Sequence, residues 1–273
     1  LKYKCGNILA VSDLRGKDKE KFTYTQIADL ITKASKSFKY YGLVKGDVVT
    51  LISENSPRWL IADQGLMRLG AINAVRGINA PSEELEYIIE HSNSVGLIVQ
   101  SKDIWLKLNK KNQLEQKLKF IINLEDEKSE KLINWNEFIK AGDKKYLKDK
   151  NPHDKNYDIN DLASILYTSG TTGKPKGVKR SLVEGDPDDV LSMFAMILSF
   201  FEIQPEEENV HIVGSPLYHT AVIVHSTAAL HYGHSLVVME KFDAEKMLYL
   251  IDKYKVTTSH MVPTQFHRLL QLP

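Results

Sequence analysis

The feature that most constrains the fold of this chain is an alternation of two hydrophobic patterns from residue 48 onward. Short runs rich in β-branched residues predict strands at Val48–Ile52, Ala71–Val75, Val95–Val99, Phe120–Leu124, Leu162–Tyr167, Val210–Gly214, Leu236–Met239 and Val256–Ser259. Helical spacing predicts helices at Pro57–Leu69, Ser82–Glu90 (capped by Ser82), Ile104–Leu118, Trp135–Ile139, Asp188–Phe201, Ala221–Tyr232, Ala244–Tyr254 and from Pro263 onward. This alternation is typical of parallel-type sheets with helical crossovers, so the sequence predicts an α/β fold.

One segment interrupts this alternation. Residues 143–160 are dominated by Asp, Lys and Asn, include Pro152 and contain few apolar residues. Such a composition is typical of surface loops. We therefore expect a linker at 143–160 between two stacked α/β units, residues 1–142 and residues 161–273.

The composition argues against several classes of protein. The chain has 36 Lys and Arg against 35 Asp and Glu, whereas nucleic-acid-binding domains carry a basic excess. The single cysteine, Cys5, excludes a disulfide framework and fits a reducing compartment. The apolar run Val190–Phe201 is shorter than the roughly 20 residues of a spanning helix, and no secretory signal opens the chain. We expect a cytoplasmic protein without nucleic-acid partners, and the composition allows peripheral contact with a membrane.

The segment richest in chemistry follows the strand expected at Leu162–Tyr167. Residues 167–177 hold three Gly, three Thr, one Ser and two Lys. Glycine lets the backbone approach a ligand closely, and successive N–H groups, hydroxyls and ammonium groups can then converge on an anion. The segment is therefore expected to bind phosphate. It is not a Walker A loop, because Pro175 stands where that motif needs Ser or Thr and a helix.

Residues 167–178, Tyr-Thr-Ser-Gly-Thr-Thr-Gly-Lys-Pro-Lys-Gly-Val, resemble the signature loop of the adenylate-forming superfamily, which includes acyl-CoA synthetases, firefly luciferase and the adenylation domains of peptide synthetases. The Pro-Leu-Tyr-His segment 216–219 and the early segments are most similar to fatty acyl-CoA synthetases. Further matches lie at residues 22–28, 46–49, 54–57, 69–71, 242–243 and 262–264. The resemblance implies that the chain is part of the large N-terminal domain of such an enzyme.

The resemblance implies a two-step reaction with ATP, Mg²⁺ and coenzyme A. A hydrophobic, fatty-type carboxylic acid attacks the α-phosphate of ATP, and a thiol then takes the acyl group and expels AMP. Thr168 matches a position that helps to hold Mg²⁺, and Lys174 is the least constrained position of the loop. The residues expected to contact the β- and γ-phosphates are Ser169, Gly170, Thr171, Thr172, Gly173, Lys174 and Lys176.

His219 is expected at the carboxyl end of a strand, where open α/β sheets bind ligands. The resemblance makes His219 a candidate to orient the acyl carboxylate, with Lys176 as the second catalytic candidate. Val222, Val224, Pro263 and Thr264 are candidates to line the acyl pocket beside it. Histidines 211, 225, 231 and 234 invite a metal site, but no carboxylate stands beside them in a ligand motif.

Two departures from the superfamily pattern limit these expectations. The edge of the loop reads Lys179-Arg180-Ser181-Leu182 where many acyl-CoA synthetases have Ser-His-Arg, which bears on acyl specificity. The sequence stops at Pro273, before the adenine-binding Tyr-Gly-x-Thr-Glu segment, the ribose-binding Asp and the C-terminal catalytic Lys. We therefore expect negligible turnover by residues 1–273 alone. The alternatives are transfer to a carrier-protein thiol, a non-catalytic remnant that binds a nucleotide or a partner and, more remotely, a Walker-type hydrolase.

Overall fold

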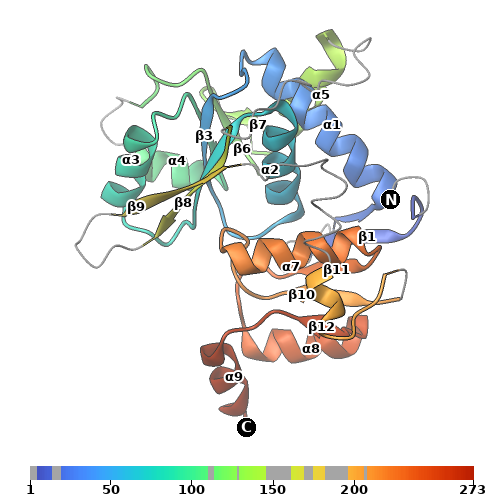
Figure 1. The fold of residues 1–273 in the computed structure, drawn as a ribbon. Coiled ribbons are helices and arrows are strands. Elements are labelled where there is room, and N and C mark those ends of the chain that lie inside the picture. Colours follow the sequence, from blue (N-terminus) through green and yellow to red (C-terminus); the bar gives the residue numbers. More distant parts are fainter. Residues whose placement is uncertain are drawn as a thin grey trace. The chain divides into compact units, whose positions relative to one another are not determined.

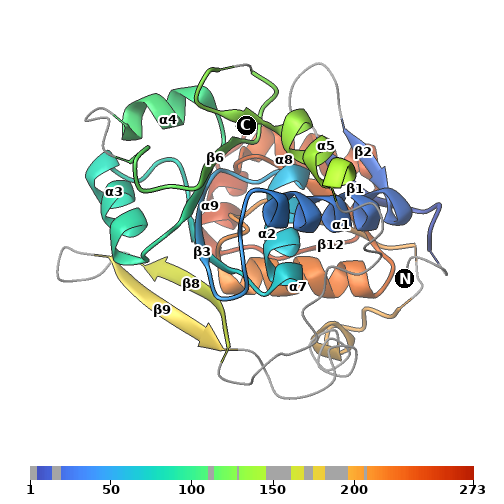
Figure 2. The same cartoon turned by 90° about the horizontal axis from the view of Figure 1, so that it is seen from above.

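The computed structural model of the chain describes residues 5–13, 20–109, 114–127, 129–145, 161–168, 175–181, 196–205 and 208–273. Figures 1 and 2 show two sheets with helices packed on their faces. The first sheet holds β3 (Val48–Ile52), β4 (Ile72–Arg76), β5 (Gly96–Val99), β6 (Phe120–Asn123), β7 (Ile133–Asn134), β8 (Leu162–Thr168) and β9 (Lys176–Ser181). The second holds β1 (Leu9–Asp13), β2 (Lys21–Thr23), β10 (Val210–Val213), β11 (Ser235–Val238) and β12 (Thr258–Ser259).

In the first sheet the strand order is β7-β6-β5-β3-β4-β8-β9, and every neighbouring pair is parallel except β8 and β9. Helices α3 (Ser82–His91) and α4 (Lys102–Leu108) cover one face, while α1 (Tyr24–Tyr40), α2 (Pro57–Leu69) and α5 (Trp135–Lys145) lie on the other (Figures 1 and 2). Successive strand residues point to opposite faces. Accordingly, Leu97 and Val99 pack with α3 and α4, whereas Phe120 contacts the ring of Phe38 in α1 at 5.9 Å.

In the second sheet the order is β12-β10-β11-β1-β2, with β2 antiparallel to β1 and the other pairs parallel. Helix α8 (Ala244–Tyr254) packs on one face, where Met247 and Leu250 join Ile212 and Val237 in a buried cluster. Helix α7 (Thr220–His231) lies on the opposite face (Figure 1). The last helix, α9 (Pro263–Leu270), follows β12.

The contacts divide the chain into two units whose limits differ from the expected boundary at 143–160. Residues 1–28, 54–57 and 184–273 form one unit, and residues 29–53 and 58–183 form the other. The physical reason is strand pairing over long sequence distances. Strand β1 pairs with β11, so the N-terminal residues join the second sheet, and β8 pairs with β4, so residues beyond 160 join the first. Residues 146–160 lie outside the described residues.

Most expected elements from residue 48 onward form, and three details differ. Helix α4 ends at Leu108, where the expected helix continued to Leu118, and residues 115–117 form a turn. Ser82 does not cap α3, because the N-cap is Pro81 and no side chain caps that end. Of the expected helix Asp188–Phe201, residues 188–195 lie outside the described residues, and residues 196–199 are helical. Across the part of the chain that the structure describes, no helix is both long and apolar enough to span a membrane.

Candidate functional site

The phosphate-loop sequence lies between the two strands of an antiparallel hairpin. Thr168 pairs with Lys176, and Tyr167 pairs with Gly177. Strands in such a pair lie about 5 Å apart, so the backbones of Thr168 and Lys176 lie side by side at the two ends of the loop sequence. Pro175 is buried and Lys176 is exposed, whereas the predicted ligands Ser169, Gly170, Thr171, Thr172, Gly173 and Lys174 lie outside the described residues. A strand follows the loop, not the helix of a Walker A motif, so the structure removes the Walker-type alternative.

The base of this hairpin is held by an aromatic contact that depends on Gly177. A Cβ atom at Gly177 would lie 2.9 Å from Cγ2 of Ile165 and 3.3 Å from the ring of Tyr167, so only glycine lets this ring lie across β9. The Tyr167 hydroxyl is 2.9 Å from Nδ1 of His91, at the end of α3. Burial, and next the nearby Tyr87, raise the pKa of Tyr167 to about 12. The hydroxyl thus stays protonated and ties β8 to α3.

His219 stands at the N-cap of α7, after the carboxyl end of β10, as the sequence predicts. Its side chain is exposed, and its ring lies 4.8 Å from the ring of Tyr218. The backbone carbonyl of His219 accepts a hydrogen bond from the amide of Ile223, which starts the helix. An exposed imidazole at the carboxyl edge of a parallel sheet is placed where a ligand can reach it.

A buried amide holds the segment that leads to His219. Asn55 donates to the carbonyls of Ser215, at 2.8 Å, and Met239, at 3.1 Å, and it accepts from the amide of Leu217 at 2.7 Å. Asn55 is 2% exposed. In the sequence, residues 54–57 stand out only as a match to the superfamily, and no role is predicted for Asn55. Asparagine in a short turn-like segment gives no local signal that it binds a loop 160 residues away.

A second buried amide, Gln265 of α9, supports the same segment from another side. Gln265 accepts from the hydroxyl of Ser215 at 3.0 Å and donates to the carbonyl of Gly214 at 3.1 Å. The predicted pocket residues beside it differ in exposure: Val222 is buried, Val224 is half-buried, and Pro263 and Thr264 are exposed. These residues and His219 belong to one unit, and the hairpin belongs to the other.

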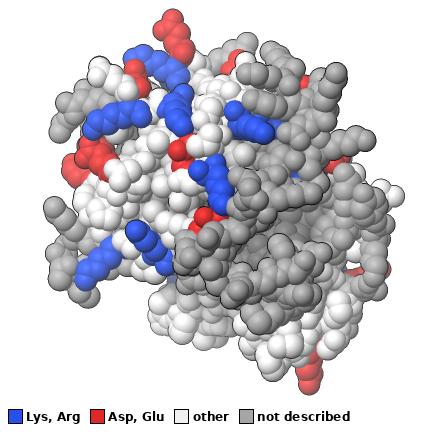
Figure 3. Space-filling view, turned by 45° about the horizontal axis from the view of Figure 1, so that its top comes forward, with Lys and Arg blue, Asp and Glu red and all other residues white. Residues whose placement is uncertain are grey.

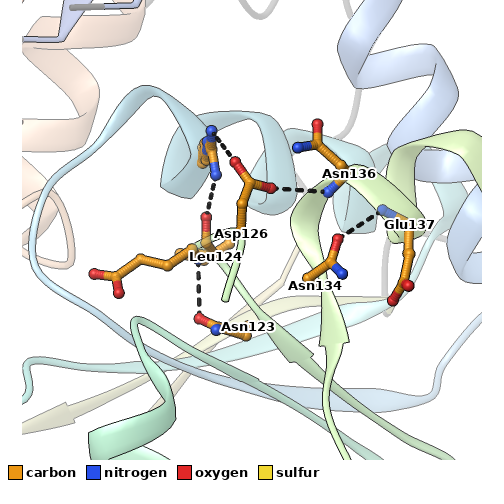
Figure 4. Close-up of polar contacts among 8 residues, drawn as sticks. Asn123, Leu124, Asp126, Asn134, Asn136 and Glu137 are labelled. Carbon is orange, nitrogen blue, oxygen red and sulfur yellow. Dashed lines mark hydrogen bonds and ion pairs between the residues drawn. The ribbon is translucent and has the colours of Figure 1, made fainter. Parts of the chain in front are cut away.

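Two observations concern polar side chains away from this segment. No group of three or more His, Cys, Asp or Glu side chains in the described residues is arranged to hold a metal ion. At the ends of β6 and β7, Asp126 accepts from the amide of Asn136, and Asn134 accepts from the amide of Glu137 and so caps α5 (Figure 4). On the face that Figure 3 draws, basic side chains are interspersed with acidic ones.

Comparison with known proteins agrees with this geometry. A family model described as AMP-binding enzyme matches residues 3–273. The long-chain-fatty-acid–acyl-carrier-protein ligase AEE15 of Arabidopsis thaliana is 33% identical over 189 residues, which are 64% of this chain and 26% of that protein. The 2-succinylbenzoate–CoA ligase of Bacillus pumilus is 25% identical over 252 residues, 92% of this chain and 46% of that protein.

The fold is also that of solved adenylate-forming enzymes. The structure of O-succinylbenzoate coenzyme A synthetase from Bacillus subtilis, in complex with ATP and magnesium ion, superposes with a TM-score of 0.70 at 18% identity. The match covers 99% of this chain and 64% of that one. The hairpin, the mostly parallel sheets and the family match together define the class: this chain belongs to the AMP-binding enzyme family. It spans about half, or less, of the length of these curated relatives.

Proposed function

We propose that this chain is the ATP-binding part of an acyl-CoA synthetase that acts on a hydrophobic carboxylic acid, of fatty type. The observation that carries the proposal is the superfamily loop sequence closed at its base by the β8–β9 hairpin. The family to which the chain belongs, and the ligase activities in the names of its relatives, support the same chemistry.

In the first step a carboxylate oxygen of the acid attacks the α-phosphorus of ATP. The bond from the α-phosphorus to the bridging oxygen breaks, pyrophosphate leaves, and an acyl-adenylate forms. The main obstacle is repulsion between an anionic nucleophile and an anionic polyphosphate. Positioning and neutralisation of charge therefore supply most of the rate enhancement.

The residues of the loop are suited to this task. Backbone N–H groups and hydroxyls of residues 169–173, with the ammonium of Lys176, hold the β- and γ-phosphates and stabilise the departing pyrophosphate. Mg²⁺, when bound, neutralises phosphate charge, and Thr168 is the residue of this chain that would help to hold it. His219 orients the carboxylate of the acid. Val222, Val224, Pro263 and Thr264 line the acyl pocket.

In the second step the sulfur of coenzyme A attacks the acyl carbonyl, and AMP leaves. The alternative acceptor is the thiol of a carrier protein. The Arabidopsis relative, which is named as an acyl-carrier-protein ligase, supports this alternative. Incubation of the intact protein with acid, ATP and either thiol distinguishes them, because only the true acceptor yields a thioester. The further alternative, a remnant that binds nucleotide without catalysis, predicts stabilisation by ATP without pyrophosphate release.

Two matched pairs of variants test the proposal in the intact protein. Lys176→Ala is expected to lower kcat/KM for ATP by about 10- to 100-fold, because it removes a charge aimed at the phosphates. The control Lys179→Ala changes an exposed lysine of the same strand and should stay within twofold. His219→Ala should lower acid-dependent pyrophosphate release at least about tenfold with an unchanged unfolding midpoint. Its control, His267→Ala, alters an exposed histidine of α9. A panel of acids that yields no ATP-dependent pyrophosphate release would overturn the proposal.

A further inference from the structure

Three histidines from three elements meet on the α7 side of the second sheet. His211 lies in β10, His225 lies in α7, and His260 directly follows β12. Ile212 points into the cluster that α8 covers, so its neighbour His211 points to the opposite face, where α7 lies. The rings of His225 and His260 are 4.7 Å apart. We call these three residues the histidine cluster.

Two ring nitrogens of the histidine cluster lack a hydrogen-bond partner in the part of the chain that the structure describes. Nδ1 of His211 is 3.0 Å from the Thr258 hydroxyl, but its Nε2 is buried without a hydrogen-bond partner among the described residues, as is Nδ1 of His260. His211 is only 3% exposed. Nδ1 of His225 donates to the carbonyl of Ala221 at 2.8 Å. Buried polar atoms normally have hydrogen-bond partners, so these unpaired nitrogens call for an explanation.

The surroundings of His211 and His260 disfavour protonation of these two rings. Burial lowers the pKa of His211 to about 3, and His225, His260 and His234 lower it further by repulsion. Burial, and next His225, lower the pKa of His260, against a smaller opposing effect of a backbone hydrogen bond. The charge interactions on these two histidines that the described residues supply come from other histidines, and no carboxylate contributes. A proton added to His211 therefore meets other histidines and little solvent.

We propose that the histidine cluster is an acid-sensitive latch, which holds α7 on its face of the second sheet while the rings of His211 and His260 are neutral and releases α7 when these two rings take up protons. Helix α7 begins directly after His219, so release of α7 also displaces His219. The effect on catalysis rests on the proposed function, whereas the latch itself does not.

The direction of the pH dependence follows from linkage. A histidine whose pKa is lower in the closed form binds fewer protons there than in the open form. The closed form is therefore favoured above the ordinary histidine pKa of 6.5 and loses stability as the pH falls below it toward 3. Between pH 7 and pH 5, one histidine kept neutral in the closed form increases the open fraction about 25-fold.

Amide hydrogen exchange, divided by the intrinsic rate at each pH, tests the latch in the intact protein without substrate. The open fraction measured at the amides of α7 should be about 25-fold larger at pH 5 than at pH 7. The open fraction of α3, in the other unit, should change little. His211→Gln removes the most buried ring and should reduce the ratio for α7 to less than about threefold. His260→Gln, at a half-buried position, should also reduce it. His267→Gln, on the surface of α9, is the matched control and should leave it unchanged.

The outcomes separate clearly. A ratio below threefold for α7 in the unaltered protein overturns the latch, as does an equal loss in His260→Gln and His267→Gln. If His211→Gln does not fold, the unaltered protein and His260→Gln still decide. The measurement uses neither ATP nor the carboxylic acid substrate. Failure of the latch is therefore distinct from failure of the proposed ligase activity.

Discussion

The side chain of Asn55 offers the sharpest test of how the segment before His219 is held. Replacement by Ala removes three hydrogen bonds at once, to the carbonyls of Ser215 and Met239 and from the amide of Leu217. All three backbone groups then lie at a site where Asn55 itself is 2% exposed, so water does not readily replace the lost partner. An unsatisfied buried polar group costs about 1–3 kcal/mol, so three such groups give a loss of about 3–9 kcal/mol for Asn55→Ala.

Urea unfolding of the protein and its variant measures this loss, and hydrogen exchange locates it. Exchange of residues 214–219 should increase more than exchange of α3, because the lost bonds lie in the unit that contains β10. Asn136→Ala is the matched control: Asn136 is exposed on α5, and its replacement should change the free energy of unfolding by less than about 0.5 kcal/mol. A loss below 1 kcal/mol for Asn55→Ala would refute the view that this amide fixes the segment.

Two further predictions concern the unit that carries the hairpin. Gly177→Ala should destabilise the protein by about 1–3 kcal/mol and weaken ATP binding, because its Cβ would press on Ile165 and Tyr167. The control is Gly214→Ala, whose Cβ would meet nothing nearer than 3.6 Å. Equal effects of the two substitutions would contradict the packing argument. Burial raises the pKa of Asp63 from 3.8 to about 6, against hydrogen bonds from Gln64 and Asn73 that lower it. The proton is therefore held more tightly in the folded state, and the associated stability is complete below about pH 4 and lost as the pH rises through 6. Relative to Asp63→Asn, the free energy of unfolding should fall by about 2 kcal/mol between pH 4 and pH 7, and parallel pH profiles for the two proteins would show that the carboxyl does not titrate this way.

Local patterns in the sequence determine much of the secondary structure. Helices α2 and α8 have the bounds that helical spacing predicts, and β3 coincides with its apolar run. The signature loop is also readable from the chain alone, because its glycines, hydroxyls and lysines are contiguous. These features depend on residues within one or two turns of each other, so a linear reading captures them.

Tertiary structure decides which segments become partners. The sequence does not reveal that residues 9–13 pair with β11, or that β8 joins β4, because strand pairing is set by packing between distant segments. For the same reason Asn55 and the histidine cluster gain their surroundings only in the folded chain. Ser82 has the side chain of a cap, yet Pro81 takes the capping position and α3 starts without a side-chain bond. The sequence alone thus determined most of the elements and predicts the phosphate-binding chemistry. The fold decided which buried polar groups support these elements, because burial and pairing exist only between elements brought together from across the chain.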